Sequence, residues 1–187
     1  MKYKNQSLVK YLDDLAAKVP APGGGSAAAL NAAMGASLVC MVINFTLGKP
    51  KYSGFKTELK IILRKSEKLR KQFLDLVDLD VVAYQSKNTR DALAVPLRLA
   101  RLCCQAVQLC PALIKKSNIN LISDLAVAVV FLESAFTSAC FNVEINLRSL
   151  ADAKFTQVTQ KELKQMDRII FKIRKNTEES VGKIIRR

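Results

Sequence analysis

"PAPGGGSAAALNAAMGASLVCMV", residues 20–42, opens with two prolines and three glycines and continues as small, mostly apolar side chains. It belongs to thirty consecutive positions, 19–48, that carry no charged residue. Such a run is long enough to cross a bilayer. Its early prolines and glycines, and Asn31 and Asn44 within it, favour a buried central helix instead. We expect Ser26 to be the N-cap of that helix and the helix to continue to about Leu47.

The side chains of this predicted helix sort into two rows. One row holds the large residues Leu30, Met34, Leu38, Met41 and Phe45. The other row holds the small residues Ala29, Ala33, Ala36 and Cys40. A row of small side chains lets a neighbouring helix come close, so we expect this helix to be packed within a bundle.

The remaining segments also have helical spacing of apolar residues, and none alternates as a strand would. We expect helices over residues 11–17, 55–86, 90–116 and 123–150, and an amphipathic helix in the tail from about Thr159. Pro96 should lie near the first turn of its helix, and "SNIN" (117–120) should form a corner. The sequence therefore predicts one domain over residues 1–187, all-α, an antiparallel helical bundle with long helices.

The composition limits the chemistry that is available. The 187 residues include no histidine, so acid–base catalysis must use carboxylates, lysine, tyrosine or cysteine, and a histidine-ligated metal is excluded. The five cysteines form no CxxC pair and lie in apolar runs, which is typical of reduced, buried thiols in a cytoplasmic protein. We expect no metal and no cofactor.

The net charge of +14 predicts attraction to polyanions. Positive charge gathers at residues 56–71, with seven Lys and Arg against two Glu, and at 154–187, with ten against four acidic residues. Neither block has an RNP-like signature, so we interpret both as solvated helix faces. The alternative is a basic helical module that binds nucleic acid or a partner protein.

The stretch "LVDLDVVAY" (76–84) contains two aspartates with different expected surroundings. On a helical wheel Asp80 falls within the apolar arc, whereas Asp78 lies almost opposite and should be a solvated surface charge. A carboxylate on the apolar side is costly unless it is paired or protonated, and burial raises its pKa toward the range that suits proton transfer. Asp80 is therefore a candidate catalytic residue. A buried aspartate that only bonds another helix is the alternative.

Asp124 is the second candidate, at the start of a helix and just after Asn118. Its alternative role is a favourable charge at a helix N-terminus. Asn142 follows eighteen residues later on the same side of the helix, about 27 Å away, so the two cannot serve one compact site in one subunit. They belong to different sites, or Asn142 and Asn146 are interhelical hydrogen-bond pins, or a symmetric dimer brings one end to the partner's site.

Several stretches together resemble a known family. The glycine-rich helix start can bind an anion, but it is neither a P-loop nor a dinucleotide fingerprint. With "LGKPKY" (47–52), "LVDLDVVAY", "SNINLISDLAVA" (117–128) and "ACFNVEINLRSLAD" (139–152) in this order, the chain resembles the formiminotransferase-cyclodeaminase C-terminal family over about residues 11–155. The segment at 83–97 is shorter than is usual in that family.

The resemblance implies an all-helical homodimer that acts on tetrahydrofolate one-carbon derivatives, without metal or redox cofactor. The activity would be that of a formiminotetrahydrofolate cyclodeaminase or a methenyltetrahydrofolate cyclohydrolase. A non-catalytic relative that binds folate or another anion is the alternative within the family.

The resemblance also implies which residues form the folate-binding site. A folate pocket would form at Gly23, Gly24, Gly25 and Ser26, with Asp80 and Asp124 as catalytic carboxylates and Asn118 as a further lining residue. The basic Lys51 is a candidate for attracting the anionic glutamate tail of folate. Tyr84 or Phe45 could contact the planar pterin.

Overall fold

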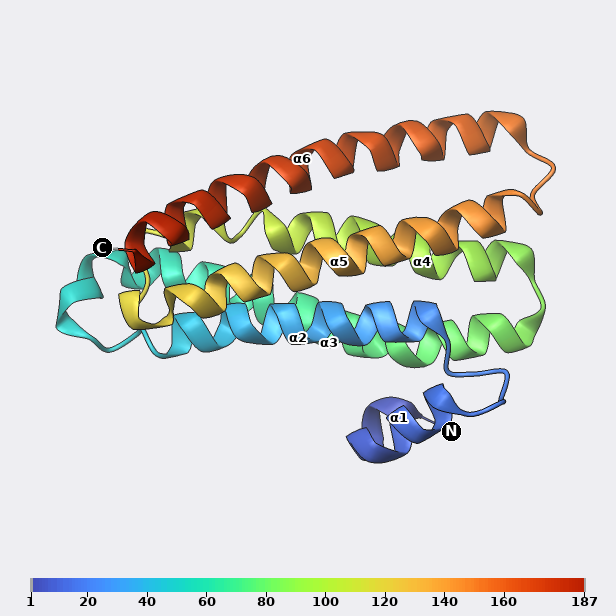
Figure 1. Ribbon diagram of the computed structural model, residues 1–187, viewed down its shortest axis with the longest axis horizontal. Coiled ribbons are helices and arrows are strands. Elements are labelled where there is room, and N and C mark those ends of the chain that lie inside the picture. Colours follow the sequence, from blue (N-terminus) through green and yellow to red (C-terminus); the bar gives the residue numbers. More distant parts are fainter. Residues whose placement is uncertain (1, 187) are drawn as a thin grey trace.

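The computed structural model describes residues 2–186, and within them it contains helices and no strand. The α-helices are α1 (Leu8–Ala16), α2 (Gly24–Asn44), α3 (Lys56–Ser86), α4 (Thr89–Val107), α5 (Ile122–Leu147) and α6 (Ala153–Ile185). Short 3-10 turns lie at Tyr3–Asn5, Pro50–Phe55, Pro111–Leu113 and Ile119–Leu121. Successive long helices run in opposite directions, and α1 lies outside the bundle beside the start of α2 (Figure 1). The predicted all-α antiparallel bundle is confirmed.

The predicted N-cap of α2 is wrong. Gly23 is the N-cap, and Ser26 already lies inside the first turn. Its hydroxyl has a different use: it accepts a hydrogen bond from the Tyr11 hydroxyl at 3.2 Å and donates one to the Val77 carbonyl at 3.0 Å. Ser26 therefore fastens α1 and α3 to the start of α2.

Two other helix limits differ from the prediction. α4 ends at Val107 rather than near Lys116, and a 3-10 turn begins at Pro111, which has no N–H to continue an α-helix. Pro96 lies well inside α4 rather than near its first turn. α6 begins at Ala153, because the Asp152 carboxylate accepts a hydrogen bond from the Phe155 N–H at 2.9 Å and caps the helix there.

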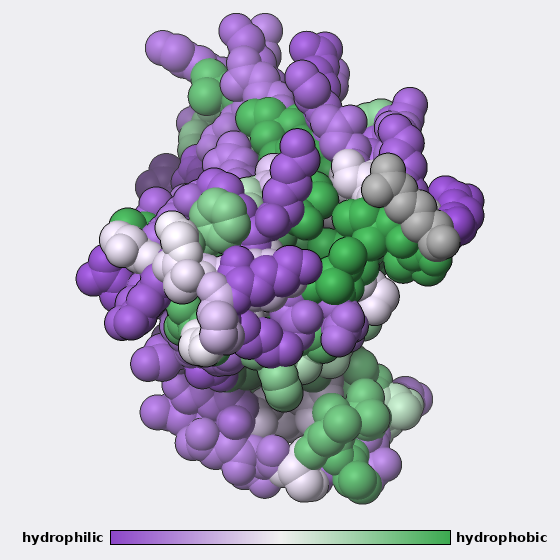
Figure 2. Space-filling view, turned by 90° about the vertical axis from the view of Figure 1, so that its left-hand side faces the viewer, coloured by the Kyte–Doolittle hydropathy of each residue, from purple (hydrophilic) through white to green (hydrophobic). Residues whose placement is uncertain are grey.

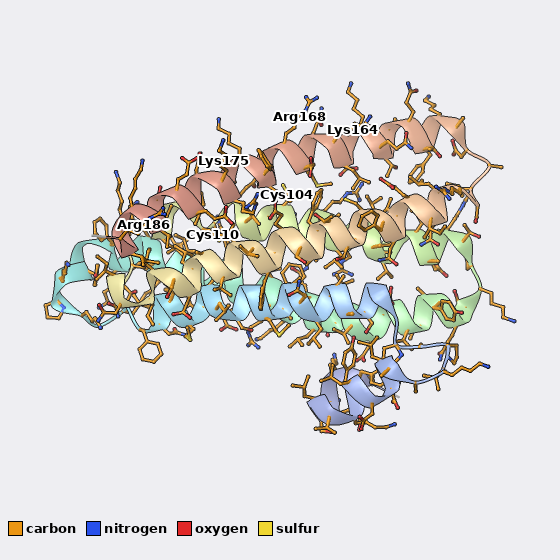
Figure 3. The ribbon with its side chains drawn as sticks, in the orientation of Figure 1. Cys104, Cys110, Lys164, Arg168, Lys175 and Arg186 are labelled. Atoms are coloured by element: carbon orange, nitrogen blue, oxygen red, sulfur yellow. The ribbon has the colours of Figure 1, made fainter. Side chains whose placement is uncertain are left out.

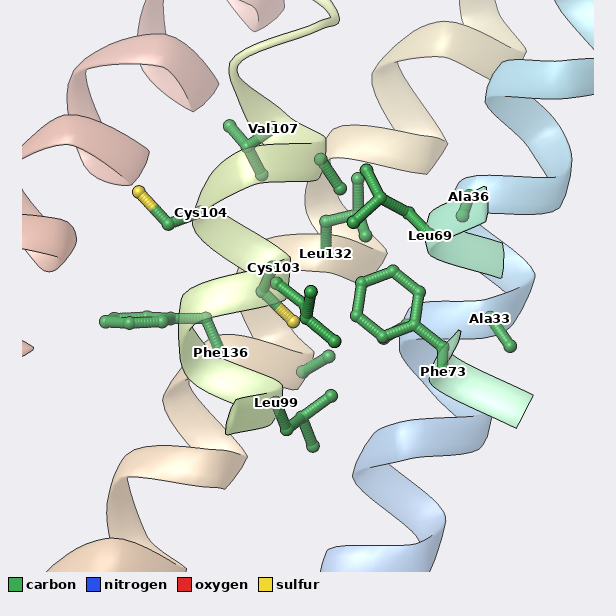
Figure 4. Close-up of a cluster of buried hydrophobic side chains, with 14 of the residues drawn as sticks. Ala33, Ala36, Leu69, Phe73, Leu99, Cys103, Cys104, Val107, Leu132 and Phe136 are labelled. Carbon is green, nitrogen blue, oxygen red and sulfur yellow. The ribbon is translucent and has the colours of Figure 1, made fainter. Parts of the chain in front are cut away.

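The row of small residues on α2 is buried, as predicted, with Ala29 and Ala36 each 1% exposed. Gly35 allows the closest approach of α5: a Cβ atom there would lie 2.9 Å from Leu132 Cγ and 3.1 Å from the Ala128 carbonyl oxygen. Larger side chains from α3, α4 and α5, including Phe73, Cys103 and Leu132, fill the centre of the bundle (Figure 4). The row of large residues on α2 lies on the other side and is only partly covered, since Met34 is 45% and Phe45 59% exposed.

Three helical stretches are long and apolar enough to cross a membrane by length and composition alone: Gly24–Asn44, Thr89–Leu113 and Ile119–Leu147. The bundle itself buries 61% of the most apolar 18-residue segment of the first stretch, as expected for a central helix. In the last, only 39% is buried, although α5 is equally apolar. α5 therefore keeps an uncovered apolar side.

The charged and sulfur-containing residues follow the expected pattern. Lys164, Arg168 and Lys175 project from the outer side of α6, away from the bundle (Figure 3). The five cysteines are unpaired; four are buried and Cys140 is half-buried. Burial raises the pKa of Cys40 and Cys110 to about 12, so these thiols are poor nucleophiles.

Candidate active site at the start of α2

A cavity of about 280 Å³ opens where α2 begins. The Pro20–Gly25 segment forms one wall, and the ends of α3, α4 and α5 supply the others. Four helices therefore bring side chains from distant parts of the sequence together. The lining residues are Pro20, Ala21, Gly23, Gly24, Gly25, Asp80, Ala83, Tyr84, Ala92, Asn142, Ile145 and Asn146.

Asp80 lies directly against the glycine-rich turn. A Cβ atom at Gly25 would lie 2.7 Å from Asp80 Cγ and 2.9 Å from Asp80 Oδ2, closer than atoms in ordinary contact. Only glycine leaves the carboxylate this position. The family resemblance implied that Asp80 lies beside residues 23–26, and it lies there in the structure.

The surroundings of Asp80 favour its protonated form more than water does. Burial raises the pKa of Asp80, and a hydrogen bond from the Ser26 backbone N–H partly offsets this rise. Among the described residues that line the cavity, Asp80 alone carries a charge. The site can therefore hold a cationic group against one partly desolvated carboxylate, or pass a proton through it.

Asn142 and Asn146 complete the α5 wall of the cavity. Asn142 Nδ2 donates to the Ser138 carbonyl at 2.9 Å, and Asn146 Nδ2 donates to the Ala92 carbonyl at 2.8 Å. Asn146 is thus an interhelical pin between α5 and α4, as one of our alternatives held, but Asn142 is not, because its bond to Ser138 lies within α5. Each amide nitrogen keeps a second N–H, so each side chain can still donate one hydrogen bond to a ligand and accept one through its carbonyl oxygen. Neither residue was predicted as part of the site, although their four-residue spacing in "NVEIN" places them on one helix face.

Three predicted site residues lie at the other end of the bundle. Asn118 is buried there, and its N–H donates to Thr46 Oγ1 at 2.8 Å. Asp124 lies in the first turn of α5. Lys51 is exposed and lies beside Tyr52, whose hydroxyl accepts a hydrogen bond from the Ile119 N–H at 3.4 Å. In one copy of the chain, these residues do not line the Asp80 cavity.

Two further expectations concern neighbours of the site. Tyr84 lines the cavity, but Phe45 lies at the far end of α2 and does not. Asp78 is half-buried rather than solvated, because the N-terminal turn covers it: the Lys4 N–H donates to Asp78 Oδ1 at 3.3 Å. The prediction for Asp78 was wrong because that turn cannot be seen on a helical wheel.

Comparison with known proteins identifies the family. The sequence profile of the formiminotransferase-cyclodeaminase family matches residues 7–88 and 85–165. The two matched parts meet at the turn between α3 and α4, where we expected a shortened segment. The chain belongs to this family.

Individual relatives agree with the family profile. The methenyltetrahydrofolate cyclohydrolase of Methylorubrum extorquens is 37% identical over 182 residues, which cover 85% of this chain and 88% of that protein. The formimidoyltransferase-cyclodeaminase of Rattus norvegicus is 32% identical over 177 residues, which cover 82% of this chain but only 33% of that longer protein. The crystal structure of formiminotetrahydrofolate cyclodeaminase from Thermotoga maritima has a TM-score of 0.92 and 26% identity, covering 97% of this chain and 98% of that one.

Proposed function

We propose that this chain is a folate one-carbon enzyme that hydrolyses 5,10-methenyltetrahydrofolate, and that Asp80 is its catalytic residue. The observation that carries the proposal is a single partly desolvated carboxylate against a glycine-rich helix start, in a cavity with no lining cation. The reacting carbon of the methenyl compound belongs to an amidinium cation. A carboxylate in partial isolation from water stabilises such a cation more strongly than it would in bulk solvent.

The chemistry needs a base and then an acid. A water oxygen bonds to the amidinium carbon while the Asp80 carboxylate accepts one water proton. The bond from that carbon to N5 then breaks, and Asp80 returns the proton to N5. The hydroxyl proton of the intermediate leaves to solvent as the formyl C=O forms on N10. A raised pKa suits both transfers, because the group must gain and lose a proton near neutral pH.

Cyclodeamination is the second candidate reaction. It is favoured by the close structural match to formiminotetrahydrofolate cyclodeaminase over nearly the whole chain. There N10 would attack the formimino carbon on N5 and its proton would pass to the imino nitrogen; ammonia would then leave, and the same amidinium cation would be the product. Asp80 would give a proton to the departing amine and then face the product's positive charge.

Asn142 and Asn146 have a supporting role in this proposal. Their side-chain carbonyl groups can accept hydrogen bonds from the N–H groups of the pterin ring, while the Asn146 nitrogen ties α5 to α4 through the Ala92 carbonyl. Tyr84, which is 60% exposed at the rim, offers an aromatic face to the planar ring. No metal or further cofactor is required by either reaction.

We further propose that the enzyme is a homodimer and works in the cytoplasm. The uncovered apolar side of α5 supports the first statement. The unpaired thiols, with no CxxC arrangement, support the second.

A spectrophotometric assay tests the proposal, because the methenyl chromophore disappears on hydrolysis and appears on cyclodeamination. The purified chain should consume 5,10-methenyltetrahydrofolate faster than the buffer does. Formation of the chromophore from 5-formiminotetrahydrofolate would instead support the second reaction. If neither substrate reacts but one binds, the chain is a non-catalytic folate-binding relative and the proposal is wrong.

A further inference from the structure

Ser26 is buried directly behind the candidate active site. It lies in the first turn of α2, is 0% exposed, and is not among the residues that line the Asp80 cavity. The family resemblance implied Ser26 as part of the folate pocket. Its complete burial instead favours a role that needs no contact with the ligand.

The backbone N–H of Ser26 has no partner within its own helix. The first backbone bond at this end of α2 joins the Ala27 N–H to the Gly23 carbonyl at 3.0 Å. In most helices an N-cap side chain accepts a bond from the N–H groups that remain, but the N-cap here is Gly23, which has no side chain. The Asp80 carboxylate of α3 accepts the bond from the Ser26 N–H instead. Asp80 is therefore held at the start of α2 by a group of the α2 backbone.

The hydroxyl of Ser26 bonds the turn of α3 that carries Asp80. It donates to the Val77 carbonyl at 3.0 Å, and Val77 precedes Asp80 by three residues, within one helical turn. The same oxygen accepts a bond from the Tyr11 hydroxyl at 3.2 Å. Because a carbonyl oxygen can only accept, the serine proton points to α3. Ser26 thus makes two bonds to one turn of α3, one from its hydroxyl and one from its backbone.

From these contacts we infer that Ser26 is a positioning residue, whose hydroxyl fixes the Asp80 turn of α3 so that the carboxylate stays against the start of α2. Ser26 contributes to the reaction only through Asp80, without touching the substrate. The inference rests on the proposed function for the role of Asp80.

The position of this turn matters because nothing separates Asp80 from the α2 backbone. A Cβ atom at Gly25 would lie 2.7 Å from Asp80 Cγ, so the carboxylate lies in direct contact with the helix start. A displacement of about 1 Å at a reacting group costs on the order of 100-fold in rate. The loss of one of the two bonds from Ser26 should cost part of that.

Tyr11 makes the other hydrogen bond of the Ser26 hydroxyl, and it attaches α1 to the bundle. Of the α1 residues, all of which the structure describes, Tyr11 alone is buried. In the end-on view of Figure 2, α1 is the lowest part of the molecule, and the green atoms there belong to its exposed apolar side chains, Leu8, Val9 and Leu12. The buried ring can hold α1 without its hydroxyl. Tyr11→Phe therefore removes one hydrogen bond of Ser26 and leaves the bond to Val77 in place.

A pair of variants isolates the bond from Ser26 to Val77. Tyr11→Phe and the double variant Tyr11→Phe/Ser26→Ala differ only in the serine hydroxyl, and neither leaves a buried phenol without a partner. The Val77 carbonyl lies inside α3 and also accepts a bond within that helix, so the double variant should still fold. If it does not, Tyr11→Phe/Ser26→Cys takes its place, because a thiol fills the position but is a weak donor.

The first readout is the rate of methenyl chromophore loss, with kcat and KM measured separately. We expect Tyr11→Phe to keep kcat within about twofold of the wild type, and the double variant to lower kcat about 10-fold with a change in KM below about threefold. A double variant with the kcat of Tyr11→Phe overturns the inference. So does a double variant with a raised KM and an unchanged kcat, because that result indicates direct contact with the substrate.

The second readout is the pKa of Asp80, which needs no turnover. The bond from the Ser26 N–H lowers this pKa and burial raises it, so a turn that is no longer held against the N–H should have a higher pKa. Carbon-13 NMR of the aspartate-labelled chain measures the pKa, with Asp80→Asn to assign the resonance. We expect a higher pKa in the double variant than in Tyr11→Phe, and an equal or lower pKa overturns the inference. If the wild-type chain acts on neither folate substrate, the proposed function fails but this comparison still tests the positioning of Asp80.

Discussion

Replacing Gly25 by alanine should abolish most activity without harming the fold. The added Cβ would lie 2.7 Å from Asp80 Cγ, whereas ordinary contacts are 3.4–4 Å, so the carboxylate must move by roughly 1 Å. A displacement of about 1 Å at a reacting group costs on the order of 100-fold in rate. Gly25 lies in the first turn of α2, where alanine is the better helix former by about 1 kcal/mol. The free energy of unfolding should therefore stay the same or increase.

The assay is the initial rate of methenyl chromophore loss, with the urea midpoint measured on the same preparation. Gly54→Ala is the matched control, because a Cβ at Gly54 meets no atom within 4 Å and Gly54 lies far from the cavity. We expect Gly25→Ala to lower kcat about 100-fold and Gly54→Ala to leave it unchanged. A Gly25→Ala enzyme with wild-type kcat would refute the assignment of Asp80. A loss of activity that accompanies a lower urea midpoint would show that the fold, not the carboxylate, had been disturbed.

Three other changes give measurable outcomes. Gly35→Ala should lower the free energy of unfolding by about 1–2 kcal/mol in urea titration, because the Ala128 carbonyl and Leu132 cannot both move away from a Cβ atom. The cost of this overpacking exceeds the gain in helix propensity. An unchanged urea midpoint would contradict the close packing of α2 on α5. Thr46→Val should lower the free energy of unfolding by about 1–3 kcal/mol, because it leaves the buried Asn118 N–H without an acceptor. Thr46→Ser keeps the hydroxyl and should retain most of the wild-type stability. Equal urea midpoints for the two variants would contradict this. Burial raises the pKa of Asp80, so the folded protein holds this proton more tightly than the unfolded chain and loses stability as the pH rises from the ordinary aspartate pKa to the raised one. Asp80→Asn should therefore raise the urea midpoint at pH 7, by an amount that shrinks toward acidic pH, and a lower midpoint at pH 7 would mean that Asp80 stabilises the fold.

Local patterns in the sequence were enough for the fold and for singling out Asp80, whereas the pairing of Asp80 with the glycine-rich turn was implied by the family resemblance. The helical wheel placed Asp80 on the apolar side of α3, and the glycine-rich helix start was interpreted as a segment that can bind an anion. Both features, the spacing of apolar residues and a run of glycines, can be seen directly in a single sequence. The close contact of Asp80 with Gly25 is where the two patterns meet.

The errors concern partners that are distant in the sequence. Ser26 has the residue type of an N-cap, but its hydroxyl bonds Tyr11 and Val77 across helices. Asn142 and Asn146 could not be assigned because their contribution depends on which helices face the start of α2. No pattern within one chain could show whether the end that carries Asn118 and Asp124 meets the Asp80 end of another copy.

The proposed function depends on the Asp80 carboxylate carrying out the reaction at the amidinium carbon. The most direct measurement is the turnover rate of Asp80→Asn on 5,10-methenyltetrahydrofolate, compared with the wild-type chain at the same pH. We expect kcat to fall about 100- to 10,000-fold, the range for loss of a general acid–base group, in a variant that still unfolds cooperatively. A folded Asp80→Asn enzyme that turns over at the wild-type rate would contradict it.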